Sequence, residues 1–266
     1  MLPRTSLITP MLLASVGALF AFGKESVAQT AQSTAIVRHV LPSEPEMERQ
    51  AAKYVGSYFL QGPGTSKRIA FTFDDGPGAH TMEILQILKK YDIKATFFLV
   101  GKNLEAHPEI ARATLDQGHV IGNHTYSHPH SKTLDAETFW NDETGRTQAI
   151  FKARLGFEPA LFRPPYGELT DEEIDMVKAH GMKVIGWSVD PKDWSMPDEK
   201  DTHAAIIDVV ATSIHGEAIV LMHDGMGGAG LNTVRAIDVL IPELKAAGYQ
   251  FTTVDRLLGV PATLRE

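Results

Sequence analysis

From Lys67 to the end of the chain, short apolar runs rich in β-branched and aromatic residues alternate with longer segments of helical period. In the longer segments, apolar residues recur at i, i+3, i+4 and i+7, as they do within residues 84–91 and 237–244. Strands that alternate with helices pair in parallel and are buried on both faces, so an α/β fold is predicted. A barrel of βα units slightly smaller than the eight-fold version fits these runs, and an open doubly wound sheet is the alternative. The seven runs are Arg68–Phe73, Ala95–Val100, His119–Gly122, Leu161–Arg163, Met182–Trp187, Ala218–Met222 and Gln250–Val254.

Length and composition exclude several classes of function. With 266 residues, the chain is long enough for one large domain or for two small ones. The formal net charge of -8 argues against nucleic acid as a partner, because phosphate binding needs clustered Lys and Arg. The absence of cysteine excludes disulfides, thiolate metal sites and cysteine nucleophiles. A neutral or cationic polymer is compatible with this composition.

The N-terminus has the features of an export signal. Arg4 precedes an apolar run from Met11 to Phe22, and the small-residue pattern at 26–28 ends in Ala28. The run is shorter than the ~20 residues that span a bilayer as a helix, so a stable membrane span is not expected. We predict that residues 1–28 are a signal peptide cleaved near Ala28, which makes the mature protein secreted or periplasmic. Residues 29–66 are predicted to be an entry segment or linker with a helix between Met47 and Leu60, and 67–266 the catalytic domain.

Polar residues follow the apolar runs at corresponding places. Asp74 and Asp75 follow the first run, His124 and His128 the third, Arg163 ends the fourth, Asp190 and Asp193 follow the fifth, and His223 and Asp224 the sixth. In a parallel βα barrel, the carboxyl ends of the strands converge on one face. These side chains are therefore predicted to form a single site.

The paired carboxylates and the paired histidines point to metal chemistry. Neighbouring residues at a strand end point in different directions, so one of Asp74 and Asp75 can bind a metal while the other moves protons. A plain Asp-Gly-Pro turn is the alternative. His124 and His128 lie on one face if the segment makes a helical turn, and imidazole suits Zn²⁺ and related ions. Solvated or core histidines are the alternative there, and His130, beyond a proline, is not expected to be a ligand.

Two further segments carry features of acyl-transfer chemistry. Pro164 and Pro165 have no backbone N–H, so the N–H of Tyr166 is a rare donor in its segment and could face a developing oxyanion. A plain strand-to-loop exit with a structural Arg163 is the alternative. As a general acid, His223 would need a partner carboxylate to hold its pKa near the working pH, and a satisfied core histidine is the alternative.

Five segments in order resemble the polysaccharide deacetylases of carbohydrate esterase family four. They are TFDDG (72–76), HTYSH (124–128), RPPYG (163–167), DPKDW (190–194) and LMH (221–223). The resemblance covers residues 67–258. The family includes peptidoglycan N-acetylglucosamine deacetylases, chitin and chitooligosaccharide deacetylases, and acetylxylan esterases. The resemblance implies a single-domain distorted (β/α)7 barrel, in agreement with the runs counted above.

Residue roles follow from the resemblance for the metal and the acetyl group. Asp75, His124 and His128 are similar to the family's metal ligands, which implies a divalent ion. Two histidines and a carboxylate suit Zn²⁺ best, although Co²⁺, Ni²⁺, Mn²⁺ and Fe²⁺ fit similar ligands. Leu221 and Trp194 resemble the apolar residues that line the pocket for the acetyl methyl group.

The resemblance also implies the residues that move protons. Asp74 is similar to the catalytic base, and Arg163 to the arginine that pairs with and orients it. His223 is similar to the general acid, and Asp193 to the carboxylate that holds and tunes this acid. The backbone N–H of Tyr166 would serve the oxyanion.

The expected activity is removal of N-acetyl groups from a polymer or oligomer that contains N-acetylglucosamine. O-Deacetylation of a polysaccharide such as xylan uses the same residues and is the alternative. A non-catalytic carbohydrate-binding module would be expected to lack Asp74 or His223, and both are present. Tyr166 and Trp194 could stack on sugar rings, whereas core packing is expected for Trp187. The glycine-rich segment 225–230 is expected to be a loop at the rim of the cleft.

Overall fold

The structure is a computed structural model that describes residues 45–196, 202–225 and 229–264. The predicted signal peptide, the first part of the predicted entry segment and residues 226–228 of the glycine-rich loop lie outside the described residues. No helix within the described ranges is long and apolar enough to cross a membrane.

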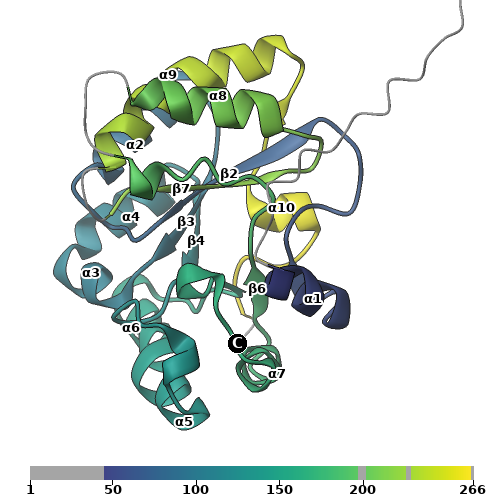
Figure 1. The fold of residues 1–266 in the computed structure, drawn as a ribbon. Helices are drawn as coiled ribbons and strands as arrows, with labels where there is room; N and C mark the ends of the chain where they lie inside the picture. Colours follow the sequence, from purple (N-terminus) through teal and green to yellow (C-terminus); the bar gives the residue numbers. More distant parts are fainter. Residues whose placement is uncertain (1–44, 197–201, 226–228, 265–266) are drawn as a thin grey trace, which may run out of the picture. The chain divides into compact units, whose positions relative to one another are not determined.

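Each of the apolar runs contains a strand, and the strands form a parallel sheet. Its order is β1-β6-β5-β4-β3-β2-β7, and β8 pairs with the beginning of β2. The helices lie around the outside of the strands (Figure 1). The strands are β1 (Tyr58–Phe59), β2 (Arg68–Asp74), β3 (Thr96–Leu99), β4 (Val120–Asn123), β5 (Leu161–Phe162), β6 (Lys183–Ile185), β7 (Ile219–His223) and β8 (Gln250–Phe251).

The strands close into a barrel unevenly, and the irregularity lies between β6 and β7. There, single bridges replace a continuous ladder: Val189 pairs with Val220 in parallel, and Gln61 pairs with Ala218 in antiparallel orientation. The cause is β1, which occupies the free edge of β6 through the hydrogen bond from Gly186 N to Phe59 O and a parallel register. The predicted distorted (β/α)7 barrel is confirmed, and the doubly wound alternative is not.

The α-helices are α1 (Pro45–Lys53), α2 (Thr81–Lys90), α3 (Gly101–Ala106), α4 (Pro108–Asp116), α5 (Ala136–Thr138), α6 (Gly145–Leu155), α7 (Asp171–Ala179), α8 (His203–Ser213), α9 (Ala229–Ala246) and α10 (Val254–Leu258). The segment 135–154 contains α5, a π-helical stretch η2 (Phe139–Thr144) and then α6. Three short 3₁₀ segments are η1 (Ser131–Thr133), η3 (Pro165–Gly167) and η4 (Asp193–Ser195).

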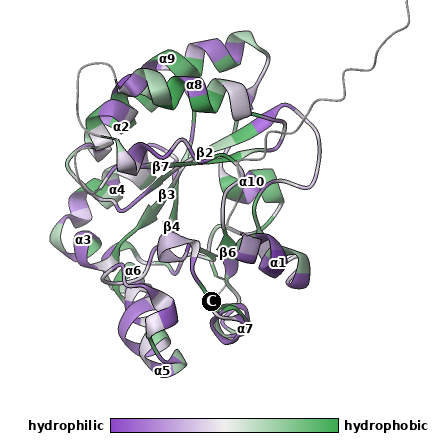
Figure 2. Ribbon diagram, viewed as in Figure 1, coloured by the Kyte–Doolittle hydropathy of each residue, from purple (hydrophilic) through white to green (hydrophobic). Residues whose placement is uncertain are grey.

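Alternation along the strands divides the core into two layers. In β2, Ile69, Phe71 and Phe73 pack against the helices, while Ala70 belongs to the cluster inside the barrel. Figure 2 shows hydrophobic colour along the strands and on parts of α8 and α9, beside hydrophilic stretches on α5 and α7. The interior cluster fills the barrel below its carboxyl end with Ala70, Phe98, Leu161, Ile185, Ile219, Val254 and Leu257.

The helix expected between Met47 and Leu60 is shorter than predicted. It ends as α1 at Lys53, and Gly56, with φ of 78°, turns the chain into β1. The aromatic pair Tyr58–Phe59 continues as a strand because the open edge of β6 offers it hydrogen bonds. Met47 is fully buried among α7 and the sheet, so α1 contributes to the core.

The burial of Met47 predicts a measurable contribution of α1 to stability. Met47→Ala should lower the free energy of unfolding by about 2–5 kcal/mol, because it leaves a cavity in a packed cluster. Val55→Ala is the matched control: Val55 is 84% exposed, and its loss should change stability by less than about 0.5 kcal/mol. Urea unfolding of both variants measures this difference. Equal stability of the two variants would mean that α1 is not part of the core.

Candidate active site

The predicted site residues meet at the carboxyl ends of the parallel strands. Asp74 and His223 are the last residues of β2 and β7, and they are partners in the register of this strand pair. His124 directly follows β4, and Arg163 directly follows β5. Because all these strands run in the same direction, their ends bring residues far apart in sequence to one face.

Asp75, His124 and His128 form a group that can hold a metal ion. Their ligand atoms lie within 4.8 Å of one another, and this is the only such group of three among the residues that the structure describes. The Nε2 atoms of His124 and His128 lie 3.5 and 3.3 Å from Asp75 Oδ1. His130 is not part of this group.

Two observations test whether these residues suit a cation. Asp75 Oδ1 is buried and has no well-formed hydrogen bond, which leaves a carboxylate oxygen aimed at two imidazoles. His124 Nδ1 lies 2.7 Å from the carbonyl oxygen of Arg163, so Nδ1 carries a proton and Nε2 is the nitrogen that faces Asp75. Metal-binding histidines are commonly fixed through their second ring nitrogen in this way. The residues therefore fit a divalent cation.

The two histidines are brought together by a loop rather than by the helical turn that their spacing suggested. Thr125 and His128 have φ of 64° and 62°, in the left-handed region, which a right-handed helical turn does not contain. The N–H groups of Tyr126 and Ser127 donate to the side chain of Glu143 and not to carbonyls of an earlier turn. The predicted helical turn is therefore wrong, although the two histidines do lie together in the group.

Charges around the group prepare it for a cation. Burial raises the pKa of Asp75, but the hydrogen bond and charge of His124 and the charges of His223 and His128 outweigh it. The net effect lowers the pKa to about 2. Burial, aided by the charge of His124, lowers the pKa of His128 to about 4, so this ring is neutral at pH 7. Burial also lowers the pKa of His124, but Asp74 and Asp75 outweigh it and raise the pKa overall.

Arg163 is fully buried beside the group and joins several strands. Its Nη1 donates to Asp74 Oδ1 at 2.8 Å and to Thr72 Oγ1 at 2.7 Å. Its Nε and Nη2 donate to the carbonyl oxygens of Ile185 and Gly186. The other oxygen of Asp74, Oδ2, faces the ligand group, 3.8 Å from His124 Nε2. One carboxylate oxygen is thus held, and the second is directed into the site.

His223 and the buried Asp193 form a second pair beside the group. Asp193 Oδ1 lies 2.7 Å from His223 Nδ1, and Oδ2 accepts hydrogen bonds from the His223 N–H and the Thr233 hydroxyl. Burial lowers the pKa of His223, but the attraction and hydrogen bond of Asp193, with the charges of Asp74 and Asp75, raise it to about 10. The imidazole is therefore protonated at neutral pH in the metal-free protein.

The comparisons with known proteins agree with this geometry. Residues 61–185 match the family model described as polysaccharide deacetylase. A peptidoglycan-N-acetylglucosamine deacetylase of Bacillus cereus is 37% identical over 201 residues, which cover 74% of this chain and 70% of that protein. The chain belongs to the polysaccharide deacetylase family.

Solved structures of this family share the fold. A crystal structure of a peptidoglycan N-acetylglucosamine deacetylase superposes with a TM-score of 0.75 at 34% identity, covering 80% of this chain and 96% of that one. The chitin deacetylase of the fungal pathogen Colletotrichum lindemuthianum gives a TM-score of 0.72 at 29% identity, covering 78% and 94%. The overall fold is thus shared with these polysaccharide deacetylases.

The remaining predicted residues lie near the carboxyl ends of the strands, in η3, η4 and β7. Tyr166, with φ of 57°, is 49% exposed, and its ring lies 4.7 Å from the ring of His128 and stacks on His130 at 3.9 Å. Trp194 is 60% exposed and follows Asp193 in η4. Leu221 is buried in β7, two residues before His223 and hence on the same face of the strand. Both exposed aromatic rings are accessible to a substrate.

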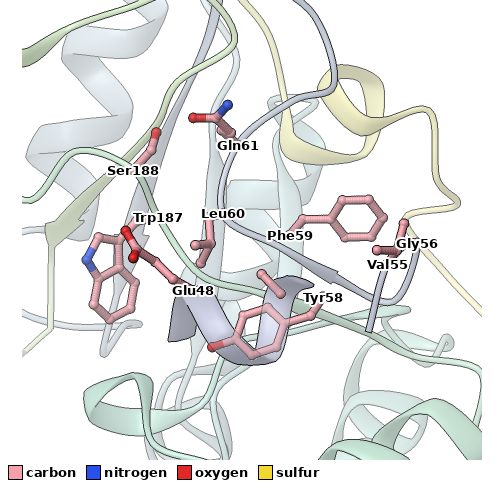
Figure 3. A pocket seen from close by; sticks show the side chains of 10 residues that line it. Glu48, Val55, Gly56, Tyr58, Phe59, Leu60, Gln61, Trp187 and Ser188 are labelled. Carbon is pink, nitrogen blue, oxygen red and sulfur yellow. The ribbon is translucent and has the colours of Figure 1, made fainter. Parts of the chain in front are cut away.

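A separate pocket of about 380 Å³ lies beside α1 and β1 and shares no residue with the ligand group. Figure 3 shows the rings of Trp187, Tyr58 and Phe59 among the side chains that line it. Trp187 also packs against the buried cluster that contains Met47 and against the interior cluster of the barrel. This agrees with the core role expected from the sequence.

Sequence reasoning missed residues that hold the site from outside. Glu143 binds the loop between the two histidines. Asp224 was noted only for its position, yet it is buried and accepts a 2.6 Å hydrogen bond from Thr81, next to the Asp75–Gly76 turn. Burial raises the pKa of Asp224 to about 7. No sequence signal identifies Glu143, because it lies in a segment of helical period far from the motifs.

The Asp193–His223 pair predicts a change in titration. Asp193→Asn should lower the pKa of His223 by roughly 1–3 pH units, since the opposing charge that stabilises the imidazolium is removed. Asp208→Asn, at an exposed position on α8, is the control with the same loss of charge. NMR titration of the His223 ring in metal-free protein measures both. An unchanged pKa in Asp193→Asn would show that Asp193 does not tune this histidine.

Proposed function

We propose that this protein is a metal-dependent hydrolase that removes acetyl groups from a polysaccharide or oligosaccharide containing N-acetylglucosamine. The observation that carries the proposal is the placement of two distinct proton carriers, Asp74 and His223, beside one group of potential metal ligands. Hydrolysis of an acetamide needs a base for the attacking water and a separate acid for the leaving amine. The names of the relatives, peptidoglycan and chitin deacetylases, support the same chemistry.

Asp75, His124 and His128 would hold the metal. A divalent cation bound there supplies Lewis acidity, which makes water nucleophilic near neutral pH. We propose Zn²⁺ as the native ion, because two imidazoles and one carboxylate with open positions are typical of catalytic zinc. Co²⁺, Ni²⁺, Mn²⁺ and Fe²⁺ accept similar ligands.

Asp74 and Tyr166 act on the attacking side of the acetamide. Asp74 accepts the proton of the water through Oδ2, while the hydrogen bond of Arg163 to Oδ1 keeps the carboxylate in place. The backbone N–H of Tyr166 donates to the developing oxyanion. Removal of one such donor typically costs ~10²–10³ in rate.

His223 acts on the leaving group. Its Nδ1 is bound to Asp193, so Nε2 is the nitrogen that gives a proton to the departing amine. Without this proton the amine would leave as an amide anion, which is a very poor leaving group. Leu221 and Trp194 would enclose the methyl group of the acetyl and exclude water from it.

Two considerations support a wall polymer as the substrate: the named activities of the relatives and the proposed export of the chain. O-Deacetylation of xylan would use the same residues. The relatives reported above are named as peptidoglycan N-acetylglucosamine and chitin deacetylases, and these names favour N-deacetylation. We also propose that the chain is exported, to the periplasm or the medium, after cleavage near Ala28, where it would meet a wall polymer.

The test is acetate release from chitooligosaccharides, peptidoglycan and acetylxylan by the metal-free and the Zn²⁺-loaded protein. We expect release from the N-acetylated substrates only, and only with metal. Release from acetylxylan alone would favour the esterase, and no release from any substrate with bound metal would favour a binding module.

Two variants separate the proton carrier from the metal ligands. Asp74→Asn should lower kcat by about 10²–10⁴ while the Kd for Zn²⁺ stays close to that of the parent protein. His128→Ala should raise the Kd itself, because it removes a ligand. Acetate release and calorimetric titration measure the two effects. Near-full activity of Asp74→Asn would mean that another residue is the base.

A further inference from the structure

A buried carboxylate outside the five motifs holds the loop that carries the second histidine. Glu143, in η2, is 8% exposed. Its Oε2 accepts hydrogen bonds from the backbone N–H groups of Tyr126 and Ser127, both at 2.8 Å. Its Oε1 accepts one from the Ser127 hydroxyl at 2.6 Å. All three donors lie between His124 and His128.

The opposite side of the same loop is held by the beginning of α3. The N–H of Gly101 donates to the carbonyl oxygen of Thr125 at 2.8 Å, and that of Lys102 donates to the carbonyl oxygen of Tyr126 at 3.0 Å. The carbonyl groups therefore have partners on α3, and the N–H groups have theirs on Glu143. Hydrogen bonds from both sides thus hold the loop in place.

The π-helical stretch that contains Glu143 is tied to the first histidine as well. Asn123, the residue before His124, donates through Nδ2 to the carbonyl oxygen of Thr144 at 2.9 Å. Its Oδ1 accepts the N–H of Thr125 at 2.9 Å. Left-handed residues such as Thr125 and His128 persist only where their surroundings hold them. π-Helical stretches of this kind often occur next to functional sites.

We propose that Glu143 is a positioning residue that fixes His128 relative to His124 and Asp75 and so sets the affinity of the metal site. The proposal rests on the metal-binding role given above to these three residues. Only a carboxylate can accept from two N–H groups and a hydroxyl without presenting a donor of its own. His124 is also held at the end of β4 by the Arg163 carbonyl, so His128 is the ligand that loses its place without Glu143.

Glu143→Gln in the full chain tests the proposal. The amide keeps the volume of the side chain but brings N–H groups toward the loop donors. We expect the Kd for Zn²⁺, measured by calorimetry, to rise about 10- to 100-fold, as for other residues that hold metal ligands. The visible spectrum of the Co²⁺-loaded variant should also change, because the ligand geometry changes.

Two further variants serve as controls. Asp142→Asn removes the same charge from an exposed neighbour in η2 and should leave the Kd within about threefold of the parent value. Ser127→Ala removes one of the three hydrogen bonds and should raise the Kd roughly 2- to 10-fold. This second variant keeps the proposal testable if Glu143→Gln does not fold.

The outcomes separate this proposal from the proposed function. A parental Kd and Co²⁺ spectrum in both Glu143→Gln and Ser127→Ala would overturn the positioning role, even if the variants melt at lower temperature. A graded loss of affinity from Ser127→Ala to Glu143→Gln would support it. If His128→Ala binds Zn²⁺ as tightly as the parent protein, the metal site itself is wrong, and both proposals fail.

Discussion

The guanidinium of Arg163 lies inside the barrel with no exposure to solvent, and the organisation of the active site follows from how that charge is satisfied. A buried charge without partners is strongly destabilising, so its donors must be paired. Arg163 donates to Thr72 and Asp74 of β2 and to the carbonyls of Ile185 and Gly186 at the end of β6. One side chain thereby links β2, β5 and β6 beneath the site. It also fixes Asp74 with one oxygen toward the barrel and the other toward the ligand histidines.

This constraint explains how two adjacent aspartates acquire different tasks. Asp74 ends a strand and points into the barrel, where Arg163 holds it. Asp75 has φ of 73°, so the chain turns immediately and brings its carboxylate to His124 and His128. The proposed metal ligands Asp75 and His128 thus lie in loops, whereas the proposed proton carriers Asp74 and His223 end strands. Strained backbone gathers at these loops, as expected where geometry serves function, at Asp75, Thr125, His128, Tyr166 and Lys192.

The sequence predicted the strands and the site far better than the contacts that hold the site in place. Apolar runs identify strands buried on both faces, and strand ends identify the site, because both depend on local pattern and parallel topology. The two-residue strand β1 has no periodicity to detect, and it exists because β6 has an open edge. His124 and His128 lie together, as their spacing suggested, although a loop held by tertiary contacts replaces the helical turn. Glu143 acts only through such contacts, so no local pattern could reveal it.

The most direct test of this account is a double-mutant cycle on Arg163 and Asp74. The free energy of unfolding would be measured in urea, with chelator present, for Arg163→Met, Asp74→Asn and the double variant. Because each single change leaves a buried group without its partner, Arg163→Met alone should cost about 3–5 kcal/mol. The double variant should be more stable than the sum of the single effects predicts, by at least about 1 kcal/mol. Additive effects would contradict the claim that this buried pair organises the site.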